Sequence, residues 1–180
     1  MQLNSISLPL TKRQAIEIVL GVALLTICSQ ILIPFKPVPI TLQTVAVLFI
    51  GLTYNRVSGT LAILSFVTLG AAGVPIFGEF SSGLPILLGI TSGYLAGFIV
   101  AVYIMASLKD KIFTSNKLLN QITLCLIGNM IIMGLGWLWL SKFLGLKEAF
   151  YSGVLFFIIP GIIKSGLLIG LINVVQPKTR

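Results

Sequence analysis

The stretch YSGVLFFIIPGIIKSGLLIGLINVV, residues Tyr151–Val175, contains a single charged side chain, Lys164. A membrane-spanning helix needs about 20 apolar residues, so this stretch is long enough to cross a bilayer. A charge near its middle costs about 3 kcal/mol or more unless it faces a partner or a water-filled cavity. Lys164 stands roughly two to three turns from either end, too far for its ammonium group to reach the lipid headgroups. We therefore expect Lys164 to bind an anionic or polar group inside the membrane, with pairing inside the helix bundle as the alternative.

The composition points to a membrane protein. The chain has 180 residues, of which 57% are hydrophobic and 9% charged, whereas about a quarter of the residues of a soluble domain are charged. We expect a single membrane domain over residues 1–180. The first apolar stretch, after Lys12 and Arg13, is too long for a signal peptide and lacks a small-residue cleavage pattern, so it is expected to remain as a helix. The net charge of +8 reflects loop residues at the membrane and does not indicate nucleic-acid binding.

Six apolar segments predict an all-α integral membrane protein, a six-transmembrane-helix bundle that passes the plasma or inner membrane several times. The second and third segments are short, which is typical of tilted or partly sheltered helices. The segments cover about residues 15–34, 40–52, 57–72, 84–108, 118–140 and 151–175.

The basic residues predict the orientation of this bundle. When the connections are assigned alternately to the two sides, most lysines and arginines fall on the side that also holds both termini, and Lys36, Lys142 and Lys147 fall on the other. The positive-inside rule then predicts cytoplasmic termini. The loops at 34–39 and 73–83, rich in Pro, Gly and aromatic residues, are expected outside, where they would cover a binding pocket.

Enzymatic chemistry finds little support in the sequence. The chain has no histidine, which removes Ser-His and His-metal chemistry, and Cys28 and Cys125 lie in different apolar segments without metal-ligand spacing. We therefore expect no enzyme activity, no metal and no cofactor.

An internal energy source is also missing from the sequence. There is no G-x-x-x-x-G-K-[ST] motif for ATP. Glu17 and Asp110 lie near the cytoplasmic ends of segments, and Glu79 and Glu148 lie in external loops, so no carboxylate is placed for a proton relay inside the membrane. A transporter of this kind would take its energy from partner subunits or only equilibrate its substrate.

Polar residues inside the apolar segments are the candidates for a binding site. Pro160 and Gly161 weaken the helix before Lys164 and make room around its ammonium group, unless they only form a kink. Thr41 and Gln43 stand at the entry of the second segment, where they can bind a ligand or link helices.

The fourth and fifth segments add further polar candidates. Thr91 and Tyr94 lie near the external end of the fourth segment, and Asn129 in the fifth needs a hydrogen-bonding partner in lipid, either a ligand or another helix. Gly93 and Gly97 form a G-x-x-x-G that predicts close helix packing.

Several motifs occur in the order found in one known family. They are PITLQT at 39–44, LGAAGVPIF at 69–77, GYLAGF at 93–98 and PGIIK at 160–164. The chain resembles, over nearly its whole length, the BioY family, the biotin-binding S components of energy-coupling-factor (ECF) transporters. The first two motifs are the most specific.

The resemblance implies a six-helix bundle with both termini inside and a biotin pocket that opens outward, formed mainly by the later helices and capped by external loops. It also implies docking onto a transmembrane coupling subunit that carries two ATPases. The absence of an ATP-binding motif agrees with a component that depends on a partner for energy.

The chain departs from the family at one place. Family members usually carry an aspartate two residues after the proline, in a P-G-D-x-x-K pattern, and here Ile162 stands there, with Lys164 matched to the lysine. An isoleucine cannot accept the N–H groups of the ureido ring of biotin. Glu79 is a substitute acceptor, and another small vitamin is the alternative ligand.

We expect Lys164 to make a charge-assisted contact with biotin, most simply with its carboxylate. Phe77, Phe80 and Tyr94 are expected to pack on its rings, and the loop from Gly73 to Gly83 to act as the gate. A structural subunit of the membrane remains the alternative from another class. The full set of predicted site residues is Lys164, Gln43, Thr41, Gly73, Phe77, Glu79, Phe80, Thr91, Tyr94, Asn129 and Gly161.

Overall fold

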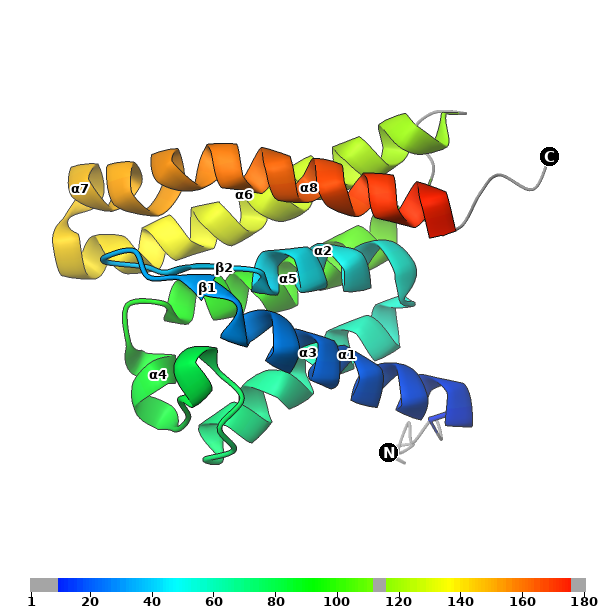
Figure 1. Cartoon of the computed structure of the whole chain (residues 1–180), viewed down its shortest axis with the longest axis horizontal. Helices are drawn as coiled ribbons and strands as arrows, with labels where there is room; N and C mark the ends of the chain where they lie inside the picture. The colour runs from blue at the N-terminus through cyan, green and yellow to red at the C-terminus, as the bar shows by residue number, and fades with distance from the viewer. Residues whose placement is uncertain (1–9, 112–115, 176–180) are drawn as a thin grey trace, which may run out of the picture.

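Backbone groups in lipid must be hydrogen-bonded within the protein, and apolar segments meet this constraint as helices. The computed structural model describes residues 10–111 and 116–175 and is built from such helices (Figure 1). The elements are α1 Lys12–Gln30, β1 Leu32–Ile33, β2 Ile40–Thr41, α2 Gln43–Thr53, α3 Arg56–Ala71, the 3-10 turn η1 Gly78–Phe80, α4 Leu84–Leu88, α5 Ser92–Leu108, α6 Lys117–Leu144, α7 Leu146–Phe150, the π-helical turn η2 Tyr151–Leu155 and α8 Phe156–Val175.

The fold is all-α, as the sequence predicts, apart from the two short strands. Among the described residues, three helical segments are long and apolar enough to cross a membrane: α1, α6 and the continuous helix Leu146–Val175 that comprises α7, η2 and α8. The helices α2, α3 and α5 are apolar but shorter.

The end of the first expected segment and the start of the second form a β-hairpin instead of helix. Leu32 pairs with Thr41 and Ile33 with Ile40 in an antiparallel ladder. Pro34, Pro37 and Pro39 lie between the strands; three prolines so close together remove several of the N–H donors that a helix would need. The chain therefore leaves α1 after Gln30 and re-enters helix only at Gln43.

The segment expected as one helix over 84–108 is divided into α4 and α5. Gly89 is extended, with φ −78° and ψ −173°. Its carbonyl accepts hydrogen bonds from Trp139 Nε1 at 2.9 Å and from Ser92 Oγ at 2.7 Å. The Gly89 carbonyl therefore accepts hydrogen bonds from side chains at the place where the helix is interrupted. A new helix, α5, begins at Ser92.

The later helices begin or end beyond their expected limits. The α6 helix continues to Leu144, where Gly145 with φ +82° ends it. The last helical run begins at Leu146 and passes through η2, where the Gly153 carbonyl accepts a hydrogen bond from the Tyr94 hydroxyl at 2.8 Å. Pro160 lies inside α8 without interrupting it.

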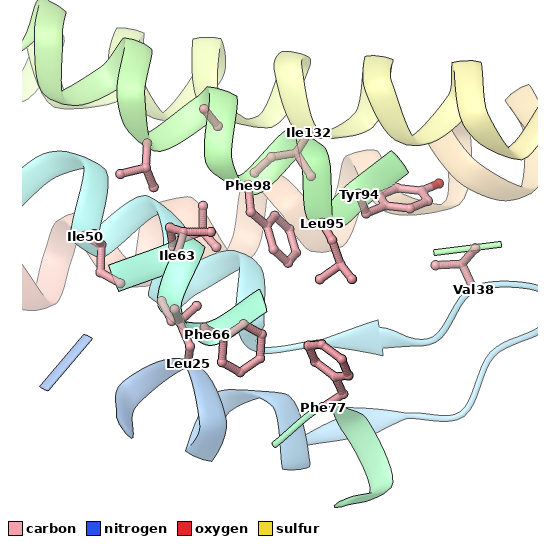
Figure 2. Close-up of a cluster of buried hydrophobic side chains, with 14 of the residues drawn as sticks. Leu25, Val38, Ile50, Ile63, Phe66, Phe77, Tyr94, Leu95, Phe98 and Ile132 are labelled. Carbon is pink, nitrogen blue, oxygen red and sulfur yellow. The ribbon is translucent and has the colours of Figure 1, made fainter. Parts of the chain in front are cut away.

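The helices pack in layers around α5. In Figure 1, α6 and α8 lie along one face, α1 and α3 along the opposite face, and α2 and α5 between them, in agreement with the contacts between elements. Figure 2 shows the buried apolar cluster that these layers share. Leu25 from α1, Ile50 from α2 and Phe66 from α3 are fully buried, and Phe98 from α5 and Ile132 from α6 join them.

The two glycines of the G-x-x-x-G motif allow α5 and α6 to approach closely, as the sequence predicts. A Cβ atom on Gly93 would lie 2.4 Å from Trp139 Cβ, and one on Gly97 would lie 2.9 Å from Ile132 Cα. No real Cβ atom fits at these distances, so the close packing of the two helices requires glycine at both positions.

Polar contacts gather at the end of the bundle opposite the hairpin. Glu17 of α1 accepts hydrogen bonds from Ser58 Oγ and Asn55 Nδ2, which join α1 to the start of α3. The Lys109 ammonium group donates to the Tyr54 carbonyl at the end of α2. Burial lowers the pKa of Lys109, against the opposing effects of Asp110 and Glu17.

The glycine contacts yield a stability test. We expect Gly97→Ala to lower the free energy of unfolding by about 1–3 kcal/mol, because the new methyl group meets the backbone of α6, which cannot rotate away. Gly166→Ala in α8 is the matched control, since a Cβ atom there meets nothing within 4 Å. Thermal unfolding of the purified protein in detergent measures both, and equal melting temperatures for the two variants would contradict the packing role.

Candidate functional site

A cavity of about 450 Å³ lies at the hairpin end of the bundle, between the hairpin, the loop with η1, and the helices α5 and α6. Ligand pockets of this size that are mainly apolar with a few placed polar groups are typical of small-molecule sites. Its lining residues are Leu32, Pro34, Phe35, Lys36, Val38, Pro39, Thr41, Gln43, Thr44, Phe77, Gly78, Glu79, Ser81, Ile86, Thr91, Tyr94, Leu95, Phe98, Asn129, Ile132, Met133 and Phe157.

The walls of the cavity are extensions of the apolar core. Val38, Phe77, Leu95 and Phe98 belong to the buried cluster and also line the cavity (Figure 2). Tyr94 contributes its ring to this wall and not its hydroxyl, because the hydroxyl already donates a hydrogen bond to the Gly153 carbonyl. A ligand that fills this part of the cavity must therefore be largely apolar.

One group of polar residues lines the cavity where β2 leads into α2. The Thr41 hydroxyl donates to Gln43 Oε1 at 3.4 Å, and Thr44 follows on the next residue of α2. Gln43 is buried, with 8% of its surface exposed. The helix begins at Gln43, so the turn from strand to helix brings these side chains to the cavity.

Lys164 is next to this polar region but is not among the lining residues. Its ammonium group donates to the Thr41 carbonyl at 2.7 Å, so α8 is tied to the hairpin across 123 residues of sequence. This is the pairing within the bundle that the sequence left as an alternative. The lysine therefore holds a residue of the cavity wall, and its charge lies just behind that wall.

Asn129 of α6 lines the cavity and is 9% exposed. Its Nδ2 donates to the Cys125 carbonyl and to Ser165 Oγ, both at 2.9 Å. Its Oδ1 accepts no hydrogen bond among the described residues. Gly161 is the neighbour on α8, since a Cβ atom there would lie 3.5 Å from Asn129 Oδ1.

The loop over residues 73–83 borders the cavity with residues between 77 and 81 and not with its first residues. Phe77 points into the core against Phe66, with ring centroids 5.4 Å apart, and lines the cavity. Glu79 lines the cavity as well, whereas Phe80 is 69% exposed and outside the lining. Gly73, with φ +102°, is exposed and also outside it.

The end of α1 fastens this loop. Ser29 Oγ donates to the Ile76 carbonyl at 2.6 Å, Gln30 Nε2 donates to the Phe77 carbonyl at 3.0 Å, and the Phe80 N–H donates to Gln30 Oε1 at 3.0 Å. Ser29 and Gln30 are not among the site residues predicted from the sequence. The available signal was a pair of adjacent polar residues at the end of an apolar helix, directly before the proline-rich loop.

Most of the predicted site residues thus meet around one cavity. Lys164 and Gly161 contact lining residues, and Gly73 and Phe80 lie away from it. The predicted residues in the lining are Thr41, Gln43, Phe77, Glu79, Thr91, Tyr94 and Asn129.

The structure also corrects the match to the P-G-D-x-x-K pattern. The pattern puts the lysine five residues after the proline, at Ser165, whereas Lys164 follows Pro160 by four. Ile162 is 61% exposed on the outer face of α8, so a carboxylate there would point away from the cavity. Gly161, Lys164 and Ser165 face the bundle instead.

The fold and the cavity define a helical membrane protein with a cavity of small-molecule size at one end. A family model described as the BioY family matches residues 2–180, and the chain therefore belongs to the BioY family. Its relatives with assigned names are transporters, and the family is not one of enzymes.

Two relatives and one solved structure illustrate the similarity. A probable biotin transporter BioY of Rickettsia prowazekii is 40% identical over 149 residues, which are 83% of this chain and 76% of the relative. One of Pyrococcus horikoshii is 36% identical over 162 residues, 90% and 95% of the two chains. A crystal structure of the S-component for biotin from an ECF-type ABC transporter matches with a TM-score of 0.78 at 26% identity, over 93% of this chain and 95% of that one.

The contacts of Gln30 yield a test of how the loop is held. We expect Gln30→Ala to speed hydrogen exchange over residues 73–83 several-fold, because each lost hydrogen bond is worth about 1 kcal/mol. Exchange measured by mass spectrometry reports this directly. Gln121→Ala is the matched control, since the Gln121 side chain accepts a hydrogen bond from Asn173 of α8, away from the loop. Unchanged exchange in Gln30→Ala would show that other contacts hold the loop.

Proposed function

We propose that this chain is a biotin-binding S component of an ECF transporter and mediates the uptake of biotin. The observation that carries the proposal is the cavity of about 450 Å³, apolar with a polar region, in a chain whose backbone follows that of an S-component for biotin over 93% of its length. Biotin has an apolar chain and sulfur ring together with a polar ureido ring and a carboxylate, which suits such a cavity.

The proposed topology is six transmembrane segments with both termini in the cytoplasm. The start of α1 and the end of α8 lie at the end of the bundle away from the hairpin (Figure 1). Lys12, Arg56, Lys109 and Lys117 are at element boundaries of that same end. The positive-inside rule then directs the cavity outward from the plasma or inner membrane, toward arriving substrate.

The shorter helices are compatible with this topology. The 11 residues of α2 rise about 16 Å at about 1.5 Å per residue, roughly half of the hydrocarbon thickness of about 30 Å. The hairpin directly precedes α2 and lines the cavity. Irregular backbone at membrane depth is tolerated where it lines a cavity or is buried in protein.

We propose that the polar region binds the polar groups of biotin and the apolar wall its ring and chain. Gln43, Thr91 and Asn129 offer amide and hydroxyl groups, and Lys164 adds a positive charge behind Thr41 that favours a ligand oxygen. Phe77 and Tyr94 offer ring surfaces.

Energy for uptake would come from partner subunits. The sequence has no ATP-binding motif, and an ECF-type transporter is the context given for the similar S-component. We propose docking onto a transmembrane coupling subunit that carries two ATPases, so that hydrolysis in the partners changes the access of the cavity.

One observation favours a second ligand class. The acidic residue of the P-G-D-x-x-K pattern has no counterpart on the inner face of α8, where Gly161, Lys164 and Ser165 stand. If that carboxylate were required for the ureido ring, the cavity would suit another small vitamin of similar size.

Equilibrium binding of labelled biotin to the detergent-purified protein tests the proposal. We expect saturable binding that weakens about 10- to 100-fold in Lys164→Ala, because the Thr41 carbonyl loses its donor and the polar part of the wall loses its positive charge. Lys142→Ala is the matched control, because Lys142 lies 4.3 Å from the Trp139 ring centroid and outside the cavity lining. Competition with other vitamins separates the two ligand classes, and no biotin binding by a wild type that unfolds cooperatively would overturn the proposal.

A further inference from the structure

Asn129 carries an unused hydrogen-bond acceptor. The side chain is 9% exposed and lines the cavity, and its Oδ1 has no hydrogen-bond partner among the described residues. A buried acceptor without a donor is unfavourable in any protein, and more so in a cavity with apolar walls. Such a group is maintained where a ligand supplies the missing donor.

The orientation of this amide is fixed by its surroundings. Nδ2 lies 2.9 Å from the Cys125 carbonyl oxygen, which can only accept, so the atom facing it must be the N–H donor. Nδ2 also donates to Ser165 Oγ at 2.9 Å. Both N–H groups are used in this way, and the amide cannot turn over without losing them. Oδ1 is therefore held as a pure acceptor.

The unpaired oxygen is enclosed, with almost no accessible surface, in a residue that lines the cavity. Cys125, one turn before Asn129 on α6, and Ser165 of α8 are outside the lining, whereas Ile132 and Met133 on the next turn of α6 line the cavity. Across from them, Gly161 of α8 has no side chain to cover Oδ1, and a Cβ atom there would lie 3.5 Å from it. The amide nitrogen is thus bound within the protein, and the oxygen lies unpaired beside the cavity, where a ligand donor reaches it once the side chains that enclose it move aside.

We propose that Asn129 Oδ1 accepts a hydrogen bond from a ureido N–H of the ligand and selects for it, and that Ser165 is the positioning residue that keeps the amide in this orientation. The proposal rests on biotin as the ligand. It directs the ureido ring to α6, and the carboxylate toward the exposed Lys36 on the hairpin side of the lining. A carbonyl or carboxylate oxygen at Asn129 would meet another acceptor and be rejected.

A cycle of protein and ligand changes tests the contact. The ligands are biotin and two analogues in which one ureido N–H is replaced by an ether-like oxygen, which removes the donor with little change of shape. We expect one analogue to bind wild type at least about tenfold more weakly than biotin, the loss typical of one buried hydrogen bond. In Asn129→Leu, which has similar volume and no acceptor, biotin itself binds about tenfold more weakly and the difference between the two ligands disappears.

The outcomes separate this proposal from the proposed function. Suppose that the wild type binds biotin and that Asn129→Leu discriminates against both analogues as well as the wild type does. This result overturns the proposed hydrogen bond and leaves biotin binding in place. Wild type that does not bind biotin overturns both.

Ser165 is tested by the same discrimination ratio. We expect Ser165→Ala to reduce the ratio between biotin and the sensitive analogue several-fold and Ser165→Thr, which keeps a hydroxyl, to restore it. A role in packing alone would lower the melting temperature without changing the ratio.

Asn173→Leu is the matched control for Asn129→Leu. Asn173 makes the same kind of bridge between α8 and α6, with Nδ2 donating to Gln121 Oε1 at 3.0 Å and to the Ile169 carbonyl at 2.9 Å, but it does not line the cavity. We expect it to destabilise the protein and to keep full discrimination. Equal loss of discrimination in both variants would overturn the proposal.

Discussion

The hydrogen bond from the Lys164 ammonium group to the Thr41 carbonyl is the contact on which the cavity depends. A charge in an apolar helix has to find polar partners inside the protein, since lipid offers none. The partner is a backbone carbonyl of the hairpin, 2.7 Å away. This hydrogen bond fixes the position of the hairpin relative to α8. It thereby also fixes the position of the polar residues that follow at the start of α2. The polar part of the cavity is therefore a consequence of the buried charge.

The sequence predicts the features that polar residues mark, because a polar residue in an apolar segment is rare enough to carry information. Thr41, Gln43, Thr91 and Asn129 stand out in this way and meet around one cavity. The hairpin was not predicted, although the prolines between Pro34 and Pro39 exclude a helix there. A proline-rich loop and a short hairpin leave the same local pattern, and only the pairing of Leu32 with Thr41 distinguishes them.

The apolar wall and the supporting contacts lie beyond what this sequence can show. Phe98 and Met133 line the cavity, while Met130 faces outward at 72% exposure, yet all three are apolar residues of membrane helices. Hydrophobic periodicity cannot distinguish these positions, because the lipid, the protein core and the cavity wall all favour apolar side chains. Ser165 supports Asn129 across two helices, and nothing local to either residue indicates that pairing.

The end of α1 connects two parts of the cavity lining, the hairpin and the loop over residues 73–83. The chain passes from Gln30 directly into the hairpin, and the Gln30 side chain also holds the loop at Phe77 and Phe80. The hairpin is thus covalently continuous with α1, and the loop is hydrogen-bonded to the end of α1. Because the far end of α1 is joined to α3 through Glu17 and Ser58, the helix is anchored at both of its ends. A displacement of α1 against α5 would therefore move the hairpin and the loop together, relative to the parts of the lining that α5 and α6 provide.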